Sequence, residues 1–358
     1  MASTSTKAAG TKSILTPSIT LNGHENRIES MSYFPDGQRM ISGSWDKTAR
    51  QWDLKAGKEI EKARGVCEEE VSAVAVSKNG RWVATGGGDW NTTELKVCEV
   101  ETGIVKTFKG HSRWIICIDI SADNTLLASG SADETARIWN LDTGKLVAGP
   151  FNSDDYVGAV RFSPDSKKLA FRSYWGSCLE VWDVQSQKLD VRIGTNFGTT
   201  ITYAPIFWTN DKKTIIATFS FTDVHAKTIY EFDGSTLETV GTPFQGHIER
   251  VIGLALSFRG ALLASASKDN TIKLWDYESR HLLASFDVQN PQIIVLSPNS
   301  RQLASVINNE DENDYKIYIC DTPPDVLAQA RVRSLHKHLL FVYRHSLTDK
   351  CTQKGSSP

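Results

Sequence analysis

The sequence predicts an all-β fold, a seven-bladed β-propeller of four-stranded antiparallel blades whose ring is closed by the N-terminal strand. Three observations favour it: a segment that recurs in three copies, a weaker repeat that continues between them, and short apolar runs separated by turn-forming residues. Repeated units of four short strands are typical of propellers, in which radial repetition leaves only short strand edges exposed.

The recurring segment occupies residues 23–53, 110–140 and 246–276. In every copy a Ser follows a His by 18 positions, an Asp follows the Ser by 4, and a Trp follows the Asp by 6. The three quartets are His24, Ser42, Asp46 and Trp52; His111, Ser129, Asp133 and Trp139; and His247, Ser265, Asp269 and Trp275. Identical spacing in three places indicates that the copies build the same local structure.

Looser copies complete the series. The position held by the quartet Trp recurs at 52, 98, 139, 182, 232, 275 and 320. Turn-forming segments lie midway, at residues 34–37, 77–80, 121–124, 163–166, 209–212, 257–260 and 297–300. The runs between the turns are of strand length and rich in Val, Ile, Leu and aromatic residues, and no helical period appears within 13–321. Seven units follow.

An open ring would expose two unpaired strand edges. The run SILTPSITL at 13–21 precedes the first unit, whereas only TPPD follows Asp321. We therefore expect 13–21 to supply the outer strand of the seventh blade. The predicted organisation is a disordered tail over 1–12, the propeller over 13–321, and a basic and apolar C-terminal tail over 322–358.

The units resemble the WD40 repeat, with GH at the start and Trp-Asp at the end, over residues 13–321. The second, fourth, fifth and seventh units lack the GH pair and the full quartet. The resemblance implies that each quartet is a hydrogen-bonded relay. This relay would satisfy a buried Asp (Asp46, Asp133 or Asp269) and join two loops on one face to the third strand.

An acyl-transfer triad of Ser129, His111 and Asp133 is the competing interpretation. A catalytic site is normally unique, whereas this quartet occurs three times, and its serines lie in strand runs without a G-x-S-x-G elbow. The other candidates are also weak. The run at 85–91 fits neither phosphate-binding pattern, the acidic run at 308–314 lacks the residues of a calcium loop, and the six cysteines are scattered. We expect no catalytic residues, no metal and no cofactor.

The formal net charge of −2 argues against nucleic acid as a direct ligand, except through a local basic patch such as the tail. No apolar run is long enough to span a membrane, and the polar N-terminus lacks the apolar core of a secretory signal. The expected location is intracellular, in the cytoplasm, the nucleus or both.

By the same resemblance, the GH loops and Asp turns form the usual docking face. Residues three positions after the His, residues just before the Asp and their neighbours should point there. These candidates are Arg27, Trp45, Trp90, Arg113, Trp114, Ala132, Arg172, Tyr174, Trp175, Arg250 and Lys268. Trp, Tyr and Arg dominate interface hot spots, so the expected function is a non-catalytic scaffold or adaptor that binds other proteins or peptides.

The arginines among these candidates suggest an acidic or phosphorylated partner. Three alternatives remain open. One is a substrate receptor of a ubiquitin ligase, although the Arg often found after the Trp-Asp pair in such receptors is absent. The others are a component of an RNA-processing complex and a propeller-type hydrolase.

Overall fold

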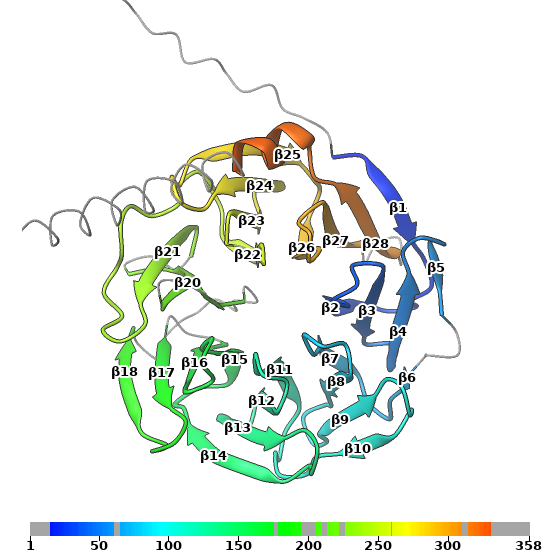
Figure 1. Ribbon diagram of the computed structural model, residues 1–358, viewed down its shortest axis with the longest axis vertical. Helices are drawn as coiled ribbons and strands as arrows, with labels where there is room; N and C mark the ends of the chain where they lie inside the picture. Colours follow the sequence, from blue (N-terminus) through cyan, green and yellow to red (C-terminus); the bar gives the residue numbers. More distant parts are fainter. Residues whose placement is uncertain are drawn as a thin grey trace, which may run out of the picture.

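The computed structural model describes residues 15–60, 65–174, 178–194, 205–209, 213–221, 226–258, 260–309 and 314–330. Seven antiparallel sheets surround a central channel, as the sequence predicts (Figure 1). The innermost strand of each blade faces the channel, and the other strands of the blade lie progressively farther from it.

The first three blades follow the chain in order. Blade 1 holds β2 (Ile28–Tyr33), β3 (Arg39–Ser44), β4 (Thr48–Asp53), β5 (Lys58–Glu59) and β6 (Gly65–Val66). Blade 2 holds β7 (Val71–Val76), β8 (Trp82–Gly87), β9 (Glu94–Glu99) and β10 (Val105–Thr107). Blade 3 holds β11 (Ile115–Ile120), β12 (Leu126–Ser131), β13 (Thr135–Asn140) and β14 (Leu146–Asn152).

The remaining blades keep this pattern. Blade 4 holds β15 (Val157–Phe162), β16 (Lys168–Ser173), β17 (Leu179–Asp183) and β18 (Leu189–Ile193). Blade 5 holds β19 (Phe207–Trp208), β20 (Thr214–Phe219) and β21 (Thr228–Asp233). Blade 6 holds β22 (Val251–Leu256), β23 (Leu262–Ser267), β24 (Thr271–Asp276) and β25 (Leu282–Asp287). Blade 7 holds β26 (Pro291–Leu296), β27 (Gln302–Asn309), β28 (Asp314–Asp321) and β1 (Pro17–Leu21).

Two blades depart from four continuous strands. The outer edge of blade 1 is divided between β5 and β6, which pair with the two ends of β4. In blade 5 the outer edge of β21 is covered only by two isolated bridges, Ile229 to Phe244 and Phe232 to Thr239. These irregular edges still give the backbone of the third strand hydrogen-bond partners at several positions.

The N-terminal strand closes the ring, which confirms the prediction. β1 pairs antiparallel with β28, placing Ile19 opposite Ile319 and Leu21 opposite Ile317 (Figure 1). The Ser18 hydroxyl donates to the Ile319 carbonyl at 3.0 Å, and Leu21 is buried. The first and last strands of the ring therefore belong to one sheet.

Neighbouring blades pack face to face through apolar side chains against very small ones. A Cβ atom on Gly43 would lie 2.6 Å from the Val71 side chain of the next blade, and one on Gly130 would lie 2.6 Å from Val157. The glycine at the last position but one of the second strand is thus required for close approach in these two blades.

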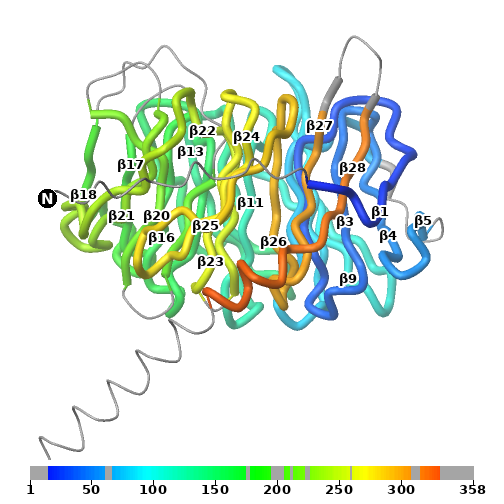
Figure 2. Tube along the Cα trace, turned by 90° about the horizontal axis from the view of Figure 1, so that it is seen from above, coloured from blue at the N-terminus to red at the C-terminus, as the bar shows by residue number. Residues whose placement is uncertain are grey.

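A short helical segment at residues 324–330 follows the last strand and lies at the lower face of the disc in the view of Figure 2. Its Val326 and Ala330 are buried among Leu262 and Leu303 of blades 6 and 7. The first part of the predicted tail therefore packs on the propeller. The expectations for residues 1–12 and for the rest of the tail lie outside the described residues.

Candidate docking face and its supporting quartets

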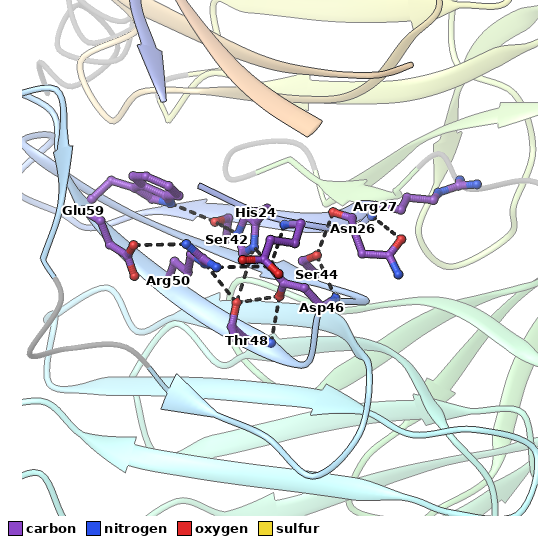
Figure 3. A network of polar contacts seen from close by, with 11 residues as sticks. His24, Asn26, Arg27, Ser42, Ser44, Asp46, Thr48, Arg50 and Glu59 are labelled. Atoms are coloured by element: carbon purple, nitrogen blue, oxygen red, sulfur yellow. Dashed lines mark hydrogen bonds and ion pairs between the residues drawn. The ribbon is translucent and has the colours of Figure 1, made fainter. Parts of the chain in front are cut away.

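The structure brings the four residues of each predicted quartet together. In blade 1, His24 Nδ1 lies 2.7 Å from Asp46 Oδ2, and His24 Nε2 lies 2.7 Å from Ser42 Oγ (Figure 3). The Trp52 indole N–H donates to the same Ser42 oxygen at 2.8 Å. All three corresponding distances are 2.8 Å in blade 3 and again in blade 6.

The hydrogen bonds of a quartet run in one direction. Because the indole can only donate, Ser129 Oγ accepts from Trp139 and gives its own hydrogen to His111 Nε2. His111 Nδ1–H then donates to the Asp133 carboxylate. This arrangement requires a neutral imidazole. In blade 6, burial lowers the pKa of His247 and so favours that neutral form.

A threonine that the sequence analysis missed completes each network. The hydroxyls of Thr48, Thr135 and Thr271 donate to the second oxygen of the quartet Asp at 2.5, 2.6 and 2.5 Å. The Asp also accepts a backbone N–H from the residue after the His, as Glu25 shows at 3.1 Å. The signal was available in the sequence, because Thr stands two positions after the Asp in all three copies.

The geometry of the quartets is incompatible with an acyl-transfer triad. The serine that would be the nucleophile is fully buried in all three copies, and its oxygen already accepts from the indole. A substrate carbonyl could not approach such a group without removing the Trp. What the quartet does instead is tie the loop before a blade to its second and third strands.

Burial alone would raise the pKa of Asp133, but the hydrogen bonds from His111 and Thr135 hold the pKa well below its usual value of 3.8. A depressed folded-state pKa stabilises the fold above the unfolded-state pKa, and this contribution is lost as the pH falls below it. We expect Asp133→Asn to lower the free energy of unfolding by about 2–3 kcal/mol at pH 7. Urea denaturation at pH 7, 5 and 3 should show that this difference narrows below about pH 4.

Asp142→Asn is the control for this experiment, since Asp142 is an exposed carboxylate that contacts Arg81 at 3.3 Å. It should change the free energy of unfolding by less than about 1 kcal/mol. A loss in Asp133→Asn that is the same at all three pH values would contradict the role given to the ionised carboxylate.

Two of the degenerate blades use a buried glutamate where the quartet is missing. In blade 2, Glu94 accepts the backbone N–H groups of Glu68 and Glu69, at 3.1 and 3.3 Å. In blade 4, Glu180 accepts the indole N–H of Trp182 at 2.8 Å. In blade 2 a carboxylate at the start of the third strand therefore holds the loop that enters the blade, whereas in blade 4 the carboxylate binds the Trp of its own strand.

The docking-face positions predicted from the repeat are joined in pairs by backbone hydrogen bonds. The N–H of Trp45 donates to the carbonyl of Arg27 at 2.9 Å, and Lys268 pairs with Arg250 in the same way at 3.0 Å. The same bond links Glu70 to Gly88, Trp114 to Ala132, and Tyr156 to Tyr174. In each of these five blades, the bond places the two residues side by side near the mouth of the channel.

Aromatic rings form a continuous arc over blades 2, 3 and 4. The ring centroids of Trp90 and Trp114 are 4.4 Å apart, those of Trp114 and Tyr156 5.7 Å, and those of Tyr156 and Tyr174 6.4 Å. Trp90 is 62% exposed. In blade 1 the Arg27 guanidinium lies 5.4 Å from the Trp45 ring centre, which continues the series.

Two predicted face residues do not reach the surface. Arg172 is only 2% exposed and donates to Thr218 of blade 5 at 2.7 Å, and burial lowers its pKa to about 10. Ala132 is fully buried. The prediction for both was wrong. Arg172 stands in the strand position that Gly130 holds in blade 3, and that position faces the next blade.

The other candidates remain near the mouth, with different exposures. Arg113 is exposed and donates to the Tyr156 hydroxyl at 3.3 Å. Arg250 and Lys268 are partly exposed, and the Lys268 ammonium donates to Asn290 at 2.8 Å. Trp175 lies outside the described residues.

The central channel is the cavity onto which this face opens. It encloses about 1720 Å³, and Arg27, Trp45, Trp90, Trp114 and Tyr174 line it. Among the residues that the structure describes, no three His, Cys, Asp or Glu side chains gather in a way that could hold a metal ion. Over the same residues, no helix is long and apolar enough to cross a membrane.

A closed seven-bladed ring, structural quartets under its loops and an aromatic rim around a channel define a propeller with a candidate docking face. Comparison with known proteins agrees with this class. The family model of the WD domain, G-beta repeat (WD40) matches residues 15–53, 63–92, 103–140 and 237–276. The chain therefore contains WD40 repeats within a seven-bladed β-propeller, and members of the WD40 propeller family are typically protein-interaction scaffolds.

The similar curated proteins are distant. Human striatin is 24% identical over 343 residues, which cover 88% of this chain but 42% of striatin. The small ribosomal subunit protein RACK1 of Caenorhabditis elegans is 28% identical over 57% of this chain and 77% of its own length. Cell division cycle 20.5, cofactor of APC complex, from Arabidopsis thaliana is 22% identical over 72% of this chain and 57% of its own length.

Proposed function

We propose that this protein is a non-catalytic scaffold that docks partner proteins or peptides on the face formed by the GH loops and Asp turns. The observation that carries the proposal is the aromatic arc of Trp90, Trp114, Tyr156 and Tyr174 at the mouth of the channel. Large rings left in contact with solvent beside a cavity are the usual anchors of an interface.

The quartets support this function by holding the face rigid. Each quartet fixes the loop that enters a blade against the turn that follows its second strand, so the exposed residues on both are positioned before a partner arrives. Preorganised surfaces lose less conformational entropy on binding. A scaffold therefore needs these networks although they perform no reaction.

The protein's location remains part of the proposal. The described cysteines, Cys67, Cys98, Cys117, Cys178 and Cys320, are all free thiols, which supports the cytoplasm or the nucleus. Burial raises the pKa of Cys117 to about 12, so this thiol is a packing group rather than a nucleophile.

Replacing Trp45, Trp90 and Trp114 together with alanine should abolish the capture of partners from a cell extract, as measured by affinity purification and mass spectrometry. The three rings are partly or largely exposed, so the melting temperature should fall by no more than a few degrees. Ile104→Ala with Val105→Ala is the matched control, because both side chains are exposed and apolar but lie on the outer rim of blade 2. Unchanged capture by the tryptophan variant, or equal loss in the control, would move the docking surface elsewhere.

The structure offers less support for the acidic or phosphorylated partner that the arginines suggested. Arg27 pairs with Glu29 at 2.6 Å, Arg172 is buried, and Arg113 is engaged with Tyr156. The charge of the face is better judged from the carboxylates around the mouth.

A further inference from the structure

Carboxylates line the channel mouth on the side of blades 1 and 2. Glu29 of β2, Glu70 just before β7 and Asp89 in the β8–β9 turn all line the channel, together with Trp45 and Trp90. Glu29 has a side chain only 14% exposed, whereas Asp89 is exposed. Glu70 is partly buried like Glu29, so two of the three carboxylates have limited contact with solvent.

The cations near this group do not balance it. Arg27 pairs with Glu29, and Lys47 lies 3.6 Å from Glu69 at the edge of the mouth. Burial raises the pKa of Glu29 to about 7, with the charge of Glu70 adding to this effect, and burial and the charge of Asp89 raise the pKa of Glu70. The charge of Lys47 opposes the rise at Glu70, and hydrogen bonds from Asn91 and Thr92 lower the pKa of Asp89. An additional cation beside Glu70 and Asp89 would relieve the remaining repulsion between these two carboxylates.

The aromatic rings beside these carboxylates would also attract a cation. The face of an indole attracts an ammonium or guanidinium group, and this attraction is strongest where water is excluded. Arg27 already shows this contact with Trp45 inside the protein. In blade 6 the positions that correspond to Arg27 and Trp45 are held by two cationic residues, Arg250 and Lys268.

We propose that the mouth of the channel on blades 1–3 binds a Lys or Arg side chain of a basic peptide segment in a partner protein. This inference rests on the proposed docking function and specifies that the docked segment of the partner is positively charged. The cationic head would lie between Glu70, Asp89 and the rings of Trp90 and Trp114, with its aliphatic stem along the rings.

The chain's own basic tail is a poor occupant for this site. The helical segment at 324–330 lines the channel through Leu327 and Ala330, and the channel lining also includes Leu256, the last residue of β22, and Phe258 just beyond it. The described part of the tail therefore lies at the mouth opposite the aromatic arc, since β22 starts at Val251, next to Arg250 of the docking face, and ends at Leu256.

The test is selection from a random-peptide phage library on immobilised full-length protein, with tail-truncated protein lacking residues 331–358 in parallel. We expect peptides enriched in Lys or Arg from both. Labelled copies of the selected peptides should bind about ten-fold more weakly, by fluorescence anisotropy, when the central Lys or Arg is replaced by Gln. Enrichment of acidic or neutral peptides, or of none, would overturn the inference.

Glu70→Gln with Asp89→Asn should weaken a selected peptide by about ten-fold or more, and Asp89→Asn alone should weaken it in the same direction. The control is Glu101→Gln with Asp142→Asn, which changes the net charge equally at exposed turns on the opposite side of the disc. Equal weakening by both pairs would indicate a general charge effect and contradict the site. Selected peptides without Lys or Arg whose binding still depends on Trp90 and Trp114 would overturn the inference and leave the docking function standing. Independence from these two rings would overturn both.

Discussion

Removal of residues 1–21 should destabilise the whole ring in one cooperative step, lowering the free energy of unfolding by about 5 kcal/mol. Burial of Leu21 contributes about 2 kcal/mol, and the lost ladder between β1 and β28 contributes about 1 kcal/mol per hydrogen bond. This sum is comparable with the whole stability of many domains. Urea denaturation followed by circular dichroism should show a large fall in the midpoint, or a chain that no longer folds.

Removal of residues 1–12 alone is the matched control, because these residues precede both β1 and Leu15, which packs against the core of blades 6 and 7. This shorter truncation should leave the unfolding curve unchanged. If removal of 1–21 gives the same curve as removal of 1–12, the pairing of β1 with β28 does not hold the ring closed.

Arg280→Ala should lower the free energy of unfolding by about 3–5 kcal/mol, because it leaves a buried carboxylate without its cation. The partner is Glu231 of blade 5, whose side chain is fully buried and pairs with Arg280 from blade 6. Glu231 also accepts hydrogen bonds from Thr214 at 2.5 Å and Tyr277 at 2.6 Å. These neutral donors cannot replace the lost charge.

Substitution of the carboxylate instead of the cation should lower the free energy of unfolding by less. Glu231→Gln leaves Arg280 12% exposed, in contact with the Val240 carbonyl and able to turn toward water. The double variant should be more stable than Arg280→Ala, since no buried charge remains, and a double-mutant cycle by urea denaturation measures this coupling. Lys168→Ala serves as the control, because Lys168 and Asp190 form a half-exposed pair at 2.9 Å that should contribute less than about 1 kcal/mol. Equal losses for Arg280→Ala and Lys168→Ala would contradict the buried-pair argument.

The blade count and the quartets could be predicted because they depend on local spacing. His111, Ser129, Asp133 and Trp139 lie within one repeat and are joined by two turns, so a fixed spacing leads to a fixed geometry. Ring closure was also predictable, since the last unit lacked a fourth strand and the N-terminus had a spare one. Thr135 was not predicted, because the repeat pattern used for the prediction contains only the other four residues.

Side chains that face a neighbouring blade were harder to place. Arg172 was expected at the surface because it was assigned to the turn that corresponds to the Asp turns of the other units, yet it lies in β16 and its side chain points into blade 5. Comparing it with Gly43 and Gly130, which occupy the corresponding position, would have shown that this position faces the next blade. Alignment of the repeats shows which strand positions face a neighbouring blade and which face solvent. The composition of a single turn does not show this.

By itself the sequence determined that this protein is a closed seven-bladed ring with three hydrogen-bonded quartets. The quartets arise within single repeats, and the ring is closed by strands from the two ends of the repeat series. Only the tertiary structure decided the charge of the face and the pairing of Glu231 with Arg280, which are 49 positions apart. Glu29, Glu70 and Asp89 likewise come from two blades, and the ring alone brings them to one channel mouth. Electrostatic interactions depend on distance in space, and in a propeller neighbouring side chains come from different repeats.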